Sequence, residues 1–279
     1  MALIVLAIVA LVIASTPAHA QQPVNDERVS VAANIDFRNA YMFRGVRQDD
    51  EGLITWPSAE AGLRLRSAGS GLTSVRVSAG TWNSLHSGFA GSDGPSGKRW
   101  YESDTHATLS LGFNNAATLN TTFTAYRSPN DMFTTVKELS VAAVVDRPLS
   151  GFSLTPYALA AFELDTQPGI GQLDGGFKAG RYLELGATPA HTAGRLTLAA
   201  PVKVGLSLGN YYELAGTDHR FGFASMAGVV TLPIIRGAGS GSLSVHGGVE
   251  YQRLGTTTKT FNGGDASKTI GSIGVGFSR

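Results

Sequence analysis

The stretch VSVAANIDFR, residues 29–38, decides the fold class of this 279-residue chain. Its large apolar side chains, Val29, Val31, Ile35 and Phe37, stand at odd positions, and polar side chains stand at most of the even positions. Alternation with a period of two residues is the pattern of a β-strand that has one apolar face and one polar face.

The same alternation recurs in twelve segments of about 10–14 residues, and no convincing helical period appears. Strands of soluble proteins average about five or six residues, whereas a tilted membrane-spanning strand needs about 9–11. The length of the segments therefore favours membrane-spanning strands. The first two segments show the alternation over residues 29–38 and 58–66, and similar segments follow at about 72–85, 100–113, 117–127, 135–146, 152–165, 178–188, 196–209, 219–232, 241–254 and 268–277.

The connections between these segments alternate in length. Long connections cover residues 48–53, 86–99, 128–134, 166–177, 210–218 and 255–267, and short ones cover 67–71, 114–116, 147–151, 189–195 and 233–240. Long outer loops that alternate with short periplasmic turns are typical of bacterial outer-membrane barrels. We expect an all-β fold, a transmembrane antiparallel up-and-down β-barrel of about 12 strands. A soluble β-sandwich with long hairpins is the alternative.

Composition narrows the function classes. The chain has 22 Lys and Arg against 21 Asp and Glu, only 15% charged residues, 35 Gly and no Cys. A net charge of +1 gives no excess of cations for binding nucleic acid. The absence of Cys excludes disulfides, thiolate zinc sites and thiol nucleophiles.

Residues 1–20 are predicted to be a secretory signal peptide. Met1 to Ile13 is almost wholly apolar, and Ala18-His19-Ala20 offers a small-residue cleavage site. A membrane anchor is the alternative, but the run is shorter than the 18 or so residues that a spanning helix needs. We expect residues 21–279 to form a single barrel domain in the outer membrane of a Gram-negative bacterium.

Charges within the strands mostly oppose the aliphatic rows, which predicts that they line the lumen. Basic residues gather in the first three strands and carboxylates in later ones, so a basic wall would face an acidic wall across a narrow pore. A filled interior, in which these charges pair only to satisfy one another, is the alternative. The predicted pore-lining residues are Arg38, Arg44, Arg64, Arg66, Arg76, Glu102, Asp104, Glu138 and Glu163.

Four basic residues break this parity: Arg47, Lys137, Arg181 and Arg253. All four fall at the predicted outer-leaflet ends of their strands, where long cations can extend toward anionic head groups. We expect them to contact lipopolysaccharide. A β-bulge or a register error of one residue explains them equally well.

Aromatic residues cluster near the predicted strand ends, as expected of the two aromatic girdles of a membrane barrel. Phe113, Phe152 and Phe277 fall at the periplasmic rim. The outer rim is predicted to carry Tyr41, Phe43, Trp56, Trp82, Trp100, Tyr101, Tyr126, Tyr211 and Tyr212.

The sequence gives no convincing enzyme site. The Ser/His pair found at a rim, His86-Ser87, falls on a Gly-rich loop, which is a poor platform for a nucleophile and its base. Six scattered His without an H-x-x-x-H element make a metal site improbable. We therefore predict a protein that is not an enzyme and has no catalytic, cofactor or metal site.

The segment Tyr41-Met42-Phe43-Arg44-Gly45-Val46-Arg47-Gln48 resembles the F-R-G-x-x-Q signature of the TorF-type porin family of proteobacteria. Gly80-Thr81-Trp82 and Trp100-Tyr101-Glu102-Ser103-Asp104 are similar to later parts of that family's pattern, whereas the ending Gly276-Phe277-Ser278-Arg279 departs from an aromatic terminus. The resemblance implies an outer-membrane barrel with a transport function and supplies no catalytic set.

Two functional hypotheses result. The first is a porin-like channel for passive diffusion of small polar or charged solutes, with the barrel assembly machinery and outer-membrane lipids as partners. The second is a closed structural or interaction barrel whose loops, chiefly 86–99 and 166–177, bind a partner. The solute and the oligomeric state stay open.

Overall fold

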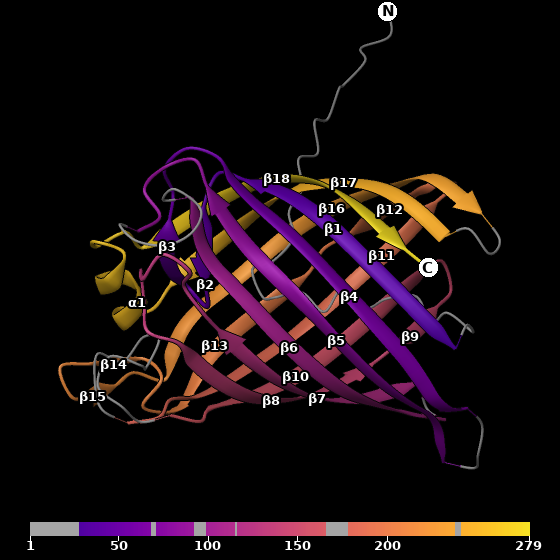
Figure 1. The fold of residues 1–279 in the computed structure, drawn as a ribbon, viewed down its shortest axis with the longest axis horizontal. Coiled ribbons are helices and arrows are strands. Elements are labelled where there is room, and N and C mark those ends of the chain that lie inside the picture. Colours follow the sequence, from indigo (N-terminus) through magenta and orange to yellow (C-terminus); the bar gives the residue numbers. More distant parts are fainter. Residues whose placement is uncertain (1–27, 68–70, 92–98, 115, 166–177, 238–240) are drawn as a thin grey trace, which may run out of the picture.

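Twelve strands form a closed antiparallel barrel, which confirms the predicted fold class (Figure 1). The computed structural model describes residues 28–67, 71–91, 99–114, 116–165, 178–237 and 241–279, so the predicted signal peptide lies outside the described residues. The barrel closes where β1 pairs with β18. The wall consists of β1 (Val29–Arg38), β4 (Ile54–Ser67), β5 (Leu72–His86), β6 (Trp100–Phe113), β7 (Ala117–Tyr126), β8 (Val136–Val145), β10 (Phe152–Glu163), β11 (Arg181–Ala193), β12 (Leu196–Ala199) continued by β13 (Val202–Gly209), β16 (Phe221–Gly237), β17 (Gly241–Leu254) and β18 (Ser267–Ser278).

Short elements supplement the wall. Pro201, which has no N–H to donate, lies between β12 and β13, and both of these segments pair with β16 as one interrupted strand. None of the helices in the described ranges is long and apolar enough to cross a membrane. The short elements are β2 (Tyr41–Phe43), β3 (Val46–Asp49), β9 (Arg147–Leu149), β14 (Glu213–Leu214), β15 (Thr217–Asp218) and α1 (Thr256–Phe261).

The two ends of the barrel differ, as the connection lengths predict. We call the end with the short connections the turn end and the other the loop end. The loop end carries β2, β3, the β14–β15 hairpin and α1, on the left in Figure 1. The start of β1 and the end of β18 lie at the turn end, where Val31 and Arg279 exchange backbone hydrogen bonds.

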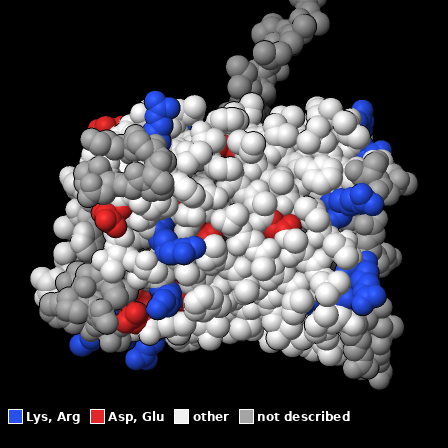
Figure 2. Space-filling view, in the orientation of Figure 1, with Lys and Arg blue, Asp and Glu red and all other residues white. Residues whose placement is uncertain are grey.

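The outer surface of the barrel is apolar and the inner surface is polar. On β1, Ile35 is 47% exposed, whereas Arg38 is 3% exposed. Figure 2 shows a visible face that is mostly uncharged, with a few Asp or Glu atoms in its middle and most of the visible Lys and Arg toward its two ends. The parity rule thus holds: Glu102, Asp104 and Glu250 are buried inside, while large aliphatic side chains face outward.

The first strand is shorter than expected. β1 ends at Arg38, not near Gln48, and residues 39–53 leave the wall. A wall strand must alternate between the two faces of the barrel, but residues 40–46 are all buried. This segment is therefore surrounded by protein on all sides.

The aromatic residues of the loop end also differ from the prediction. Trp56, Tyr101, Tyr126, Tyr211 and Tyr212 are almost completely buried, so they do not form an outward-facing girdle. They lie inside the barrel because they pack around the segment that β1 sends inward. At the turn end, by contrast, the side chains predicted for a girdle are exposed: Phe113, Phe152 and Phe277.

Candidate functional site

The connection between β1 and β4 folds into the barrel as a hairpin. β2 and β3 pair with each other, and we call residues 41–49 the inner hairpin. Its turn needs positive φ angles at two successive residues, Arg44 (φ 46°) and Gly45 (φ 84°). A Cβ atom on Gly45 would lie 2.9 Å from Cβ of Phe223, so glycine is required there for its conformation and for its size.

Alternate residues of the inner hairpin pack against opposite sides of the barrel. Met42 and Val46 belong to an apolar cluster that includes Phe223 and Leu254. Tyr41 and Phe43 belong to a second cluster, whose wall residues are Ile54, Trp56, Tyr101, Tyr126 and Val136. The hairpin therefore bridges the lumen near the loop end, with apolar contacts on both of its faces.

Arg44 at the tip of the hairpin is held by Glu138 of β8. Its two terminal nitrogens donate to the two carboxylate oxygens at 2.6 and 2.8 Å, and Nη1 also donates to the hydroxyl of Tyr211 at 2.8 Å. The guanidinium carbon lies 4.2 Å from the ring centre of Tyr182. We call Glu138, Tyr182 and Tyr211 the arginine cage. Arg44 is 4% exposed, so this ion pair is removed from water.

Neighbouring groups fix the side chains of the cage. Tyr126 donates its hydroxyl hydrogen to Glu138 Oε1 at 3.1 Å. Tyr182 donates to Glu184, which also receives a hydrogen bond from Tyr157 and pairs with Lys203 Nζ at 3.2 Å. The cage is therefore oriented by wall residues that do not belong to the hairpin.

Further hydrogen bonds tie the two strands of the hairpin to the surrounding wall. Tyr41 donates to Glu102 Oε2 at 2.8 Å, and Tyr101 donates to Gln48 Oε1 at 3.0 Å. Tyr212 donates to the carbonyl oxygen of Arg44 at 2.9 Å. These contacts fix the depth at which the hairpin lies.

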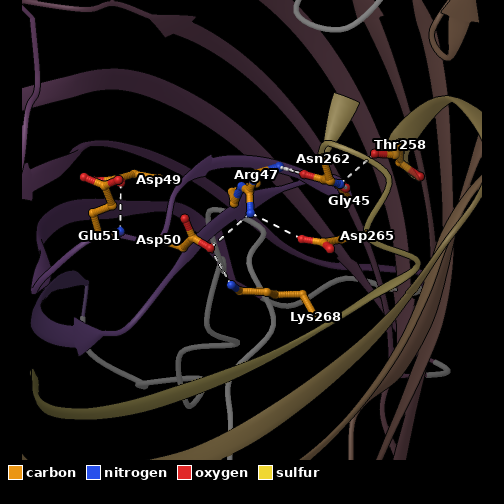
Figure 3. Close-up of polar contacts among 9 residues, drawn as sticks. All are labelled: Gly45, Arg47, Asp49, Asp50, Glu51, Thr258, Asn262, Asp265 and Lys268. Carbon is orange, nitrogen blue, oxygen red and sulfur yellow. Dashed lines mark hydrogen bonds and ion pairs between the residues drawn. The ribbon is translucent and has the colours of Figure 1, made fainter. Parts of the chain in front are cut away.

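The connection between β17 and β18 contacts the inner hairpin, as Figure 3 shows. Asn262 accepts the N–H of Arg47 at 2.6 Å and donates to the carbonyl oxygen of Gly45 at 2.8 Å. Arg47 also pairs with Asp50 and Asp265, at 3.2 and 3.4 Å. We call the contacts of Arg47, Asp50, Asn262, Asp265 and Lys268 the outer clasp.

Lys268 closes the clasp on the other side of Asp50. Its Nζ donates to Asp50 Oδ2 at 2.5 Å. This hydrogen bond, together with the nearby charges of Lys268 and Arg47, lowers the pKa of Asp50 below its ordinary value. Asp50 is therefore held as a carboxylate between two cations.

A Ser, a His and an Asp lie in a row beside the hairpin, the first two joined by a hydrogen bond and the last two by a close polar contact. Ser84 Oγ and His86 Nε2 are 2.7 Å apart, and His86 Nδ1 lies 2.7 Å from Asp49 Oδ2. Trp56 already donates its indole N–H to Ser84 Oγ, at 2.9 Å. Because the indole N–H already points at the serine oxygen, the hydroxyl hydrogen of Ser84 is free to donate to Nε2 of His86.

This arrangement resembles a nucleophile, a base and an orienting acid, and the sequence analysis missed it. Ser84 and His86 are two residues apart on β5 and share its inner face, a spacing visible in the sequence. Ser84 is fully buried, so no substrate carbonyl has access to its oxygen in this structure. The contact between His86 and Asp49 links the hairpin to the wall. Ser87, the serine weighed from the sequence, accepts the N–H of Leu53 instead.

The rest of the described lumen is polar and partly exposed. His246 pairs with Asp36 at 2.6 Å. Glu60 pairs with His106 at 3.3 Å and with Arg76 at 3.7 Å. Across the described residues, no three His, Asp or Glu side chains meet in a way that could hold a metal ion.

The predicted pore-lining residues occupy several different positions. Arg44 is on the inner hairpin and not on the wall, and Arg38 pairs with Glu250 of β17 at 3.5 Å. Glu163 accepts the N–H of Gly180 at 2.7 Å. Arg38, Arg44 and Arg76 thus have carboxylate partners, so they do not form an uncompensated basic wall. The remaining predicted residues are on the wall, Arg64 and Arg66 on β4 and Glu102 and Asp104 on β6.

The four residues predicted to contact lipopolysaccharide separate into two groups. Lys137, Arg181 and Arg253 are exposed on the wall at the loop end. Arg47 is on β3 of the inner hairpin and belongs to the outer clasp. It is not part of the wall strand to which the sequence analysis assigned it, so the parity of that strand does not apply to it.

The fold and this interior define a closed β-barrel with an inward-folded hairpin. No family model matches the chain, and no curated protein matches it. Among solved structures, it is similar to the NanC porin, with 11% identity and a TM-score of 0.46 over 88% of this chain and 98% of that one. It is also similar to an outer membrane channel from Pseudomonas putida F1, with 12% identity and a TM-score of 0.48 over 90% of this chain and 94% of that one. Similarities at this level carry no information on solute or mechanism.

Proposed function

We propose that this chain is a porin-like channel of a bacterial outer membrane, through which small polar or charged solutes diffuse. The inner hairpin constricts the channel near the loop end. The apolar outer surface supports a membrane location, because large hydrophobic side chains stay exposed around the wall. Examples are Leu65 (58%), Met226 (61%) and Ile273 (58%). A surface of this kind is stable in lipid and aggregates in water.

The polar lumen supports the passage of solutes. Groups on its inner surface between the turn end and the hairpin, such as Asp36, Glu60 and Arg76, are partly exposed and can contact water or a polar solute. In outer-membrane barrels the long loops face the outside and the short turns face the periplasm. The hairpin then controls the external entrance.

The position of the F-R-G-x-x-Q motif carries the proposal. Phe43, Arg44 and Gly45 form the tip of the inner hairpin, and Gln48 fixes its returning strand. Membership in the TorF-type porin family, which we also propose, then gives this motif a physical role as an internal constriction. Chain export by a signal peptide and insertion by the barrel assembly machinery belong to the same proposal, and Lys137, Arg181 and Arg253 are the proposed contacts with lipopolysaccharide.

Planar-bilayer recordings test this function. The wild-type barrel is compared with a variant in which residues 40–52 are replaced by a short Gly/Ser turn. We expect a small or intermittent current from the wild type and a steady current, several-fold larger, from the variant. Heat-modifiable migration on gels serves as the control for a folded barrel.

A closed interaction barrel is the second candidate function. The observation in its favour is the pair of apolar clusters that the hairpin joins across the lumen. If neither the wild type nor the folded excised variant passes current in either polarity, the channel proposal is wrong and the result favours the closed barrel.

A further inference from the structure

The arginine cage has the chemistry of a binding site for a planar cation. A carboxylate that accepts two parallel N–H bonds matches the fork of a guanidinium group, and an aromatic ring face adds a cation–π contact. Glu138 supplies the first feature and Tyr182 the second, while Tyr211 adds a hydroxyl acceptor. In this structure the protein's own Arg44 occupies the cage.

No residue of the cage belongs to the hairpin: Glu138 and Tyr182 are on the wall strands β8 and β11, and Tyr211 is in the loop that follows β13. Glu138 is held by Tyr126, Tyr182 is held by Glu184, and the backbone N–H of Tyr211 donates to Ser207 Oγ at 3.1 Å. None of these three supports involves the inner hairpin. Withdrawal of Arg44 would therefore leave a preformed site.

Withdrawal would also leave Glu138 without its cation. A buried carboxylate that loses its partner is strongly destabilised, because desolvation of the charge is no longer offset. The site therefore favours occupation by another cation of the same shape. An ammonium ion carries the charge but lacks the planar fork, so it satisfies the two carboxylate oxygens less well.

We propose that the arginine cage binds guanidinium-bearing solutes, and that Arg44 occupies the site as an internal competitor when the hairpin is in place. As a step of transport, this inference rests on the proposed channel function. As a binding site, it stands on the geometry of Glu138, Tyr182 and Tyr211 alone. The binding site and the transport step are therefore tested by separate experiments.

The binding site is tested by thermal unfolding of the folded barrel in detergent. Arg44→Ala vacates the cage, and methylguanidinium is the probe, with methylammonium and urea as the ammonium and neutral planar controls at matched ionic strength. We expect methylguanidinium to raise the Tm of Arg44→Ala in a saturable way, at a concentration about tenfold below that of methylammonium. Urea is expected to give no rise. The wild type, whose cage is filled by Arg44, should need a much higher concentration of methylguanidinium for the same rise.

A double variant is the matched control for this measurement. Arg44→Ala/Glu138→Gln keeps the volume of the cage and removes its charge, so the response to methylguanidinium should disappear. Equal responses in the single and double variants, or equal responses to methylguanidinium and methylammonium, would overturn the proposal. If Arg44→Ala does not fold, Arg44→Gln serves in its place with the same expectations.

Bilayer currents test the competition. Methylguanidinium should raise the current of the wild type by displacing Arg44, and it should lower the current of Arg44→Ala by occupying the open cage. Effects of the same sign in the two proteins contradict an internal competitor. If no variant passes current, the channel function fails, while the thermal experiment still decides whether the cage binds the cation.

Discussion

Arg38, the last residue of β1, is the ladder partner of Ile54, the first residue of β4. Residues 39–53 therefore leave the barrel wall and return to it at the same level. A two-residue turn is enough to join neighbouring antiparallel strands at such a point. The inner hairpin is thus an insertion that the wall does not need for its own pairing, and this makes its role separable by experiment.

Gly45 is expected to be the most sensitive position of the hairpin. Gly45→Ala places a Cβ in the left-handed region and against Phe223, so we expect a loss of about 1–3 kcal/mol in the free energy of unfolding. Gly264→Ala is the matched control, because its φ is also positive (97°) but nothing lies within 4 Å of the added Cβ. Urea unfolding in detergent measures both variants. Equal losses would show that contact with Phe223 has no effect.

The outer clasp is expected to loosen in acid. The pKa of Asp50 is lower in the folded protein, mainly because Lys268 donates to it, so Asp50 stabilises the clasp above its ordinary pKa of 3.8. This contribution is lost as the pH falls through the lowered value. We expect the wild-type current to rise over that acidic range.

A matched pair of variants assigns this pH effect. In Asp50→Asn the rise that belongs to the clasp should be absent, because the amide does not titrate. Glu51→Gln removes a neighbouring charge that lies outside the clasp and should leave the profile unchanged. A profile that is the same in Asp50→Asn and in the wild type would show that another group controls the pH response.

Ser84 is expected to be unreactive despite its His and Asp neighbours. Its oxygen is buried and already accepts the Trp56 N–H, so a fluorophosphonate probe should not label it in the folded barrel. Mass spectrometry of the labelled protein measures this. Labelling of Ser84 that disappears in His86→Gln would reveal an accessible nucleophile and contradict a purely anchoring role.

Lys137, Arg181 and Arg253 are expected to retain lipopolysaccharide. Replacing all three by Gln should lower the amount that co-purifies with the barrel, because phosphate groups lose three cations at the loop end. Arg236→Gln is the control, since Arg236 is exposed near the turn end of β16. An unchanged amount of lipopolysaccharide in the triple variant would refute this contact.

The sequence predicts the wall well because every wall residue faces either outward or inward. Apolar and polar residues therefore alternate along each wall strand, and this alternation can be recognised from the sequence alone. Alternation stops at Ala40, where Tyr41, Met42 and Phe43 follow as a continuous apolar run. A continuous run of this kind is typical of a segment buried on both faces, so the sequence does indicate the buried hairpin. The sequence analysis instead treated this run as the end of the first wall strand.

The inward direction of the aromatic side chains can also be predicted from the sequence. Trp56 shares its parity with Glu60 on β4, and Tyr182 shares its parity with Glu184 on β11, so both were due to face the lumen. The partners of Arg44 were not encoded in this way. Glu138 is 94 positions away along the chain, and their contact depends on how far a loop residue reaches across the closed barrel.

The outer clasp joins the first connection of the barrel to the last one. Asn262 and Lys268, which hold the inner hairpin, lie next to the seam where β18 pairs with β1. Because their places are set by the pairing of β18 with β1, we expect these contacts to form only after the final strand has joined the first. The inner hairpin would then be fixed last, so a barrel caught partway through insertion would have a wall but no outer clasp.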